Sequence, residues 1–178
     1  IIQLSEGNGI TINESNILSL DFFFRALGNT EMNNFLLNEM DIDLDDFIYD
    51  GNNKSDNLNL FDKTLHNLVI KNILHIPYEK EIDFISSHFY AIIKEKSISN
   101  LRKLNVDIFY DILSRPNLTI DDEESLFNFI LSLSSENEEY FCLFEFIEFE
   151  NLSINSIGKF LSNLSHDSIN KKIWNSLL

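Results

Sequence analysis

The chain has 178 residues and a mass of 20.8 kDa, and its 13 basic and 29 acidic side chains give a net charge of −16. This charge argues against a nucleic-acid backbone or an anionic membrane surface as a partner, because both need a basic face. Hydrophobic residues make up 44% of the chain and include 16 Phe, which is enough to build a core and excludes a disordered chain.

The cellular setting follows from what the sequence lacks. Cys142 is the one cysteine, so an internal disulfide is excluded. No run of eighteen apolar residues predicts a membrane-spanning helix, and the first residues do not resemble a signal peptide. We therefore expect an intracellular, cytoplasmic protein. Because the chain starts at Ile1 and not at Met, we also expect it to be a segment of a longer protein.

Residues 41–63 differ from the rest of the chain. They are acidic at first, then polar, and show no sustained hydrophobic period, which predicts a linker. This linker would divide residues 1–40, a small helical piece, from a helical body at residues 64–178.

The acidic start of this linker has the spacing of a calcium loop at its first three ligand positions, Asp41, Asp43 and Asp45. The sixth position is Asp46 where such a loop has Gly, and the twelfth is Asn52 where it has Glu. A solvated acidic linker is therefore the better interpretation, and no metal is expected.

Residues 64–76 form a strongly apolar stretch with helical periodicity. One interpretation is a central helix that is buried on two faces. The other is a helix that leaves one face free for a protein partner. The candidate partner-binding residues on that face are Leu65, Leu68, Val69 and Asn72.

Three more amphipathic helices are predicted at residues 82–93, 106–113 and 122–133. Asp121 is the expected N-cap of the last of these, with Glu124 at the reciprocal position of a capping box. Few Gly and Pro punctuate the chain, and the short polar connections favour pairs of antiparallel helices. The fold class predicted is therefore all-α.

Two further patterns surround these helices. A polar residue stands between two apolar ones at residues 104–106, 118–120 and 152–154, which predicts a short extended entry whose apolar residues pack inward before each helix. The aromatic run at residues 140–150 fits a buried helix that frays into an extended exit.

No residue pattern predicts catalysis or a cofactor. The four histidines stand alone, without the spacing of a zinc site, and Cys142 lies among phenylalanines, where a thiol usually behaves as a small hydrophobe. The alternative is a hydrolase that uses two opposed carboxylates. The acidic residues considered for it are Glu136, Glu138, Glu139, Glu145, Glu148 and Glu150.

The order of several short motifs resembles the BACK domain, the helical module that follows BTB/POZ domains. The family pattern has a helix ending F-I-x-x-x-F, a Leu pair, a short L-L-S helix and then L-x-[VI]-x-x-E-x-x-[VL]-[FL]. The matching segments here are Phe84-Ile85-Ser86-Ser87-His88-Phe89, Leu101 with Leu104, Ile112-Leu113-Ser114 and Leu118-Thr119-Ile120-Asp121-Asp122-Glu123-Glu124-Ser125-Leu126-Phe127.

Two other regions complete this resemblance. Residues 143–153 look like the later family segment L-L-x-x-V-R-F-P-L-L-S, with Glu148 in place of the usual Arg and Glu150 in place of Pro. Residues 9–20 and 24–32 are similar to the C-terminal end of a BTB domain.

The resemblance implies a non-catalytic interaction module that spaces a BTB domain from a recognition domain. It also implies protein partners and a role as substrate adaptor of a cullin-type ubiquitin ligase. Because the front half of a BTB domain carries the dimer surface in that family and is absent here, any oligomer is expected to form only through that half.

Overall fold

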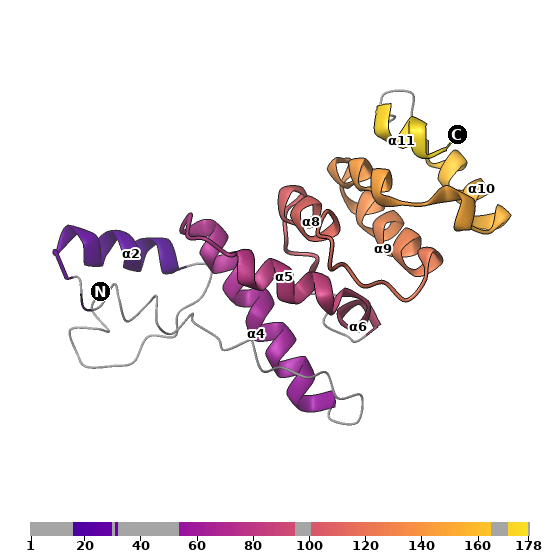
Figure 1. The fold of residues 1–178 in the computed structure, drawn as a ribbon. Coiled ribbons are helices and arrows are strands. Elements are labelled where there is room, and N and C mark those ends of the chain that lie inside the picture. The colour runs from indigo at the N-terminus through magenta and orange to yellow at the C-terminus, as the bar shows by residue number, and fades with distance from the viewer. Residues whose placement is uncertain (1–15, 30, 32–53, 95–100, 165–170, 178) are drawn as a thin grey trace.

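The computed structural model describes residues 16–29, 31, 54–94, 101–164 and 171–177 (Figure 1). Helices are the regular elements of this part of the chain, which contains no strand, so the all-α prediction is confirmed there. None of its helices combines the length and apolarity needed to cross a membrane. The possible calcium loop and most of the predicted BTB-like piece and linker lie outside the described residues.

The helices follow one another closely along the chain. The α-helices are α2 (Ile17–Ala26), α4 (Lys54–Ile73), α5 (Glu79–Ser87), α6 (Phe89–Lys94), α8 (Val106–Leu113), α9 (Glu123–Glu136), α10 (Ile154–Ser162) and α11 (Lys171–Ser176). Two 3₁₀ helices, η1 (Glu138–Phe146) and η2 (Phe149–Asn151), lie between α9 and α10.

Helix α4 begins earlier than the sequence pattern indicates. It starts at Lys54, so residues 54–63 of the predicted linker are helical, and that part of the prediction is wrong. The physical reason is Phe61, which is fully buried and lies one turn before Leu65, also fully buried. Together they extend the apolar stripe of the helix toward its N-terminus.

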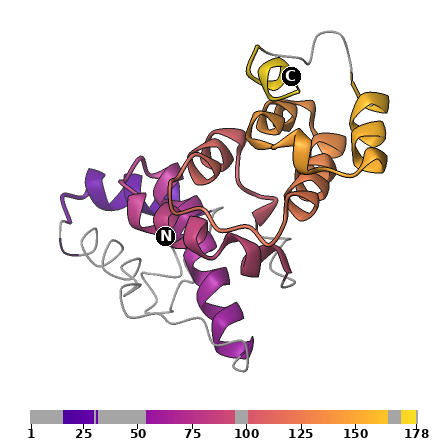
Figure 2. The same cartoon turned by 45° about the vertical axis from the view of Figure 1, so that its right-hand side comes forward.

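The helices pack as a row in which each contacts its neighbours. Helix α5 lies between α4 and α8, and η1 contacts α8, α9 and α11, while α10 packs on α9. In both views α2 and α4 lie at one end of the molecule, and α10 and α11 lie at the other (Figures 1 and 2).

Two hydrophobic clusters hold this row together. The main one runs from α4 to α11 and contains six fully buried phenylalanines, among them Phe89, Phe109 and Phe144. A smaller cluster joins α2 to the C-terminal part of α4 through Ile17, Phe24 and Ile70.

The helix predicted over residues 82–93 is interrupted at His88, which separates α5 from α6. The backbone of Thr119 lies at this break. Its N–H donates to Ser86 O and its carbonyl accepts from Tyr90 N, both at 3.0 Å. The interruption therefore depends on a residue far along the chain, which local periodicity does not report.

The aromatic run folds as the 3₁₀ helix η1 and not as an α-helix with an extended exit. A 3₁₀ helix places residues i and i+3 on the same face. Phe141, Phe144 and Ile147 have this spacing, and all three are buried. Packing of this three-residue ridge accounts for the tighter winding.

The helix entries correct two local predictions. Asn105 and Ser153 are the N-caps of α8 and α10, and each accepts a hydrogen bond from a backbone N–H of the first turn. The apolar residue before each cap, Leu104 or Leu152, is buried as predicted. The residues after the caps differ: Val106 is half-buried against the main core, whereas Ile154 is 90% exposed. The inward packing predicted for the residue after the cap is therefore wrong for Ile154 at the start of α10.

The cap of α9 is Asp122 and not Asp121. The Asp122 carboxylate accepts from Ser125 N at 2.6 Å and from the Ser125 hydroxyl at 3.0 Å. Asp121 instead forms an ion pair with Lys94 of α6 at 2.6 Å. The helix therefore starts one residue later than predicted.

Candidate functional site

A groove of about 620 Å³ lies between the α4–α5 turn and the C-terminal end of α8. Pockets that hold ligands in proteins have volumes of roughly 300–1,000 Å³. The groove opens to solvent, because several of its residues are exposed. Its lining consists of Asn72, His75, Ile76, Pro77, Tyr78, Glu79, Asp111, Ser114, Arg115 and Pro116.

One side of the groove is formed by the turn that ends α4. Ile76 N donates to Lys71 O at 2.9 Å and His75 N donates to Asn72 O at 3.2 Å, which is the bonding of a Schellman motif. His75 occupies the left-handed position of this motif with φ of 55°. Pro77 follows and cannot continue the helix, so the chain turns into α5 here.

The opposite side of the groove is formed by the C-terminal end of α8 and the residues that follow it. The helix closes at Leu113 with Ser114 as its C-cap, and Pro116 follows two residues later. Both prolines of the chain therefore line the groove, each in a turn that ends a helix. They stiffen the two turns, because proline fixes its own φ.

The groove carries negative charge. Burial raises the pKa of the Tyr78 phenol, and the nearby carboxylates of Asp111, Glu79 and Asp107 raise it further. The Arg115 guanidinium lies 3.5 Å from the Asp83 carboxylate, so part of its charge is directed away from the other acidic groups.

The four predicted partner-binding residues lie in different environments. Asn72 is half-buried and lines the groove, and Val69 is half-buried against the main core. Leu65 and Leu68 are fully buried within that core. Their burial follows from the contact between α4 and α5, which covers this side of α4.

Most groove residues were missed by sequence reasoning. His75, Tyr78, Asp111 and Arg115 come from different turns and from no common local pattern. The two prolines were the available signal, since each marks the end of a helix. Nothing in the sequence indicates that the two helix ends lie side by side.

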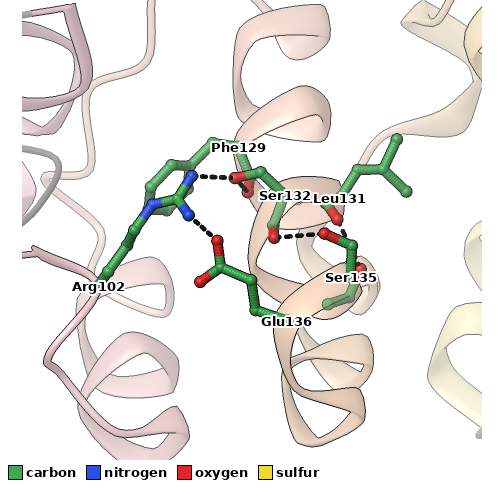
Figure 3. Close-up of polar contacts among 7 residues, drawn as sticks. Arg102, Phe129, Leu131, Ser132, Ser135 and Glu136 are labelled. Atoms are coloured by element: carbon green, nitrogen blue, oxygen red, sulfur yellow. Dashed lines mark hydrogen bonds and ion pairs between the residues drawn. The ribbon is translucent and has the colours of Figure 1, made fainter.

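Two of the acidic residues considered for the hydrolase alternative bind basic side chains of this chain. Glu136 pairs with Arg102, which also donates to the Ser132 hydroxyl at 3.2 Å (Figure 3). The Glu145 carboxylate accepts from Lys172 Nζ at 2.9 Å. Neither glutamate lines the groove.

Two carboxylates with shifted pKa values also bind protein groups. The pKa of Glu124 is lowered, because Ser153 and Ser156 donate hydrogen bonds to it. The pKa of Glu123 is raised by burial, although Glu148 N donates to it at 2.7 Å. These contacts connect the start of α9 to the segment that leads into α10.

Neither metal nor thiol chemistry gains support. Within residues 16–29, 31, 54–94, 101–164 and 171–177, no three His, Cys, Asp or Glu side chains form a group that could hold a metal ion. The Cys142 thiol is half-buried, and burial raises its pKa, which makes the reactive thiolate scarcer.

The chain was compared with protein-family models, with curated proteins and with solved structures, and none of them gives a match.

Proposed function

We propose that this chain is a non-catalytic protein-interaction module, a stiff helical spacer of the BTB–BACK type that holds adjoining domains in a fixed relation. The observation that carries the proposal is the row of helices, in which each element contacts its neighbours and α2 and α11 lie at opposite ends of the molecule (Figure 1). Such an arrangement fixes distance and direction between whatever is attached at its ends.

Polar contacts between successive elements support this stiffness. At the start of α10, the Glu124 carboxylate of α9 accepts from Ser153 N at 2.6 Å and from the Ser156 hydroxyl at 2.5 Å. In α11, the Lys172 ammonium donates to the hydroxyl of Tyr110 in α8 at 2.6 Å and to the Glu145 carboxylate in η1 at 2.9 Å. Charge-assisted hydrogen bonds are stronger than those between neutral groups, and these join different helical elements.

Large apolar side chains are exposed at both ends of the row. Leu18, Phe22 and Leu27 belong to the α2 end, and Ile154 and Trp174 belong to the other. A spacer that contacts neighbouring domains would present such residues at its two ends. They therefore support the interaction function, while the groove lies between them.

Pulsed electron spin resonance between two spin labels tests the spacer. The labels are placed on exposed positions of α5 and α10 through Lys80→Cys and Asn155→Cys, in a Cys142→Ser background that removes the native thiol. A stiff row gives one narrow distance distribution. A broad distribution would show that the two halves move independently, and the spacer proposal would then be wrong.

The cullin part of the proposal needs its own measurement. Isothermal titration of the full chain with the N-terminal domain of a cullin is expected to give a saturable binding heat if the chain is a ligase adaptor. Absence of binding heat would show that this chain does not bind the cullin by itself, and a pull-down of the full-length protein without any cullin would overturn the adaptor role. A narrow distance distribution would still support the spacer.

A further inference from the structure

We propose that the groove between the α4–α5 turn and the end of α8 binds an arginine-containing segment of a partner protein. This inference rests on the proposed function, since it names the kind of partner that the interaction module would take. The site is built from two elements that the fold brings together, so it exists only in the folded chain.

The lining combines the two kinds of surface that an arginine side chain needs. Tyr78 supplies an aromatic ring, and Ile76, Pro77 and Pro116 supply apolar surface. The methylene groups of arginine can cover apolar surface, while its planar guanidinium stacks on aromatic faces.

The carboxylates of the groove indicate that the partner carries positive charge. Glu79 and Asp111 are exposed carboxylates that come from opposite sides of the groove, one from the start of α5 and one from α8. Both line the groove together with Tyr78, and both raise the pKa of its phenol. A cation beside Tyr78 would therefore meet negative charge from two directions.

Among the groove residues that the structure describes, Arg115 is the one Lys or Arg, against the two carboxylates of Glu79 and Asp111. Arg115 lies against the Asp83 carboxylate, which is outside the groove lining. An anionic partner would be repelled by Glu79 and Asp111 and by the net charge of −16. Arginine is favoured over lysine because its guanidinium can bond to carboxylates through two N–H groups at once.

A fluorescence anisotropy titration tests the site. The probe is a fluorescein-labelled Gly-Arg-Gly-Arg-Gly-Arg-Gly peptide, and the protein is the full chain at 150 mM salt. Glu79→Gln with Asp111→Asn is expected to weaken binding about tenfold, because it removes both carboxylates of the groove. The same peptide with lysine in place of arginine is expected to bind several-fold more weakly to the unmodified chain.

The matched control separates the groove from the overall charge. Glu138→Gln with Glu150→Gln also removes two exposed carboxylates, but neither lines the groove. It is expected to change the affinity by less than about twofold. An equal loss in both double variants would show binding to bulk negative charge and would overturn the groove proposal.

A second readout keeps the test independent of how the variants fold. Amide chemical shifts of the unmodified chain, recorded during the same peptide titration, are expected to move mainly at residues 72–79 and 111–116. Shifts spread over all acidic surfaces, or no peptide binding at all, would overturn the groove site. A narrow spin-label distance distribution alongside that result would leave the spacer function standing.

Discussion

The Thr119 hydroxyl donates a 2.6 Å hydrogen bond to the carbonyl of Ser87, the last residue of α5. In an uninterrupted helix, Tyr90 N–H would donate to Ser86 O, four residues before it. Here Thr119 stands between these two groups and bonds to each. The break between α5 and α6 thus leaves no lost hydrogen bond at this point, because Thr119 satisfies both backbone groups.

The first prediction concerns this inserted threonine. Thr119→Val keeps the branched shape and the backbone bonds but removes the hydroxyl. We expect the free energy of unfolding to fall by about 1 kcal/mol, the usual net value of one hydrogen bond. Urea unfolding followed by circular dichroism measures it. Ser135→Ala removes an exposed hydroxyl that bonds within α9, and its effect should stay below about 0.5 kcal/mol.

Local periodicity predicts a helix correctly where one apolar stripe continues along its whole length. The helix predicted over residues 106–113 has those bounds in the structure, and α9 starts only one residue after the predicted start. The break at His88 could not be predicted, since it depends on Thr119, which approaches from another segment. The 3₁₀ winding of η1 likewise depends on how its phenylalanines pack against α8 and α9.

The same distinction applies to the candidate site. The apolar stripe of residues 64–76 correctly indicates a helix, but the pattern does not reveal which face α5 covers. Leu65 and Leu68 are therefore buried, while Asn72 remains at the groove. Asp111 joins it there only because α8 packs on α5 and brings its end beside the α4–α5 turn.

The second prediction concerns an ion pair between α4 and α5. Lys71 Nζ lies 2.7 Å from Glu81 Oε1, and the glutamate side chain is only 3% exposed. Its other oxygen, Oε2, is buried and has no hydrogen-bond partner. Lys71→Met should cost about 3 kcal/mol, because it leaves a buried carboxylate without its cation.

A double-mutant cycle separates this pair from simple packing. Adding Glu81→Met to Lys71→Met should restore most of the lost stability, since the uncompensated charge is then gone. Chemical denaturation of the two single variants and the double variant gives the coupling energy. Additive losses would mean that the two side chains stabilise the helices independently, contrary to this prediction.

The third prediction concerns His75, which holds a left-handed conformation at the edge of the groove. Such a conformation strains a residue with a Cβ atom, and Gly adopts it freely. His75→Gly should therefore raise the free energy of unfolding by about 0.5–1 kcal/mol, once the larger entropy of an unfolded Gly is included. The shift in melting temperature measures it.

Helix α2 offers the reverse experiment. It ends with Gly28 at φ of 64°, and Asn29 N donates to Phe24 O as Ile76 N does to Lys71 O at the end of α4. A Cβ atom at Gly28 would meet no other atom within 4 Å. Gly28→Ala should therefore cost about 1 kcal/mol through backbone strain alone. A stabilising Gly28→Ala would contradict this explanation for both helix ends.

The fourth prediction concerns acid stability at the start of α10. Hydrogen bonds from Ser153 and Ser156 lower the pKa of Glu124 below its usual 4.5. Its contribution is therefore fully present above pH 4.5 and is lost as the pH falls through the lowered value. Glu124→Gln removes this contribution, so the unfolding free energy of the variant should fall less steeply than that of the unmodified chain below pH 4.5.

Glu123 is the matched neighbour, and its pKa shift has the opposite sign. Burial raises its pKa above 4.5, so the folded chain takes up a proton more readily than the unfolded chain as the pH falls toward that value. Glu123 thus offsets part of the acid loss, and Glu123→Gln should make the loss steeper. Urea denaturation at several pH values between 3 and 6 distinguishes the two variants. If the unfolding free energy of both variants falls with pH as steeply as that of the unmodified chain, neither carboxylate is linked to folding. Opposite changes in this slope would assign the acid sensitivity of the α9–α10 junction to Glu123 and Glu124.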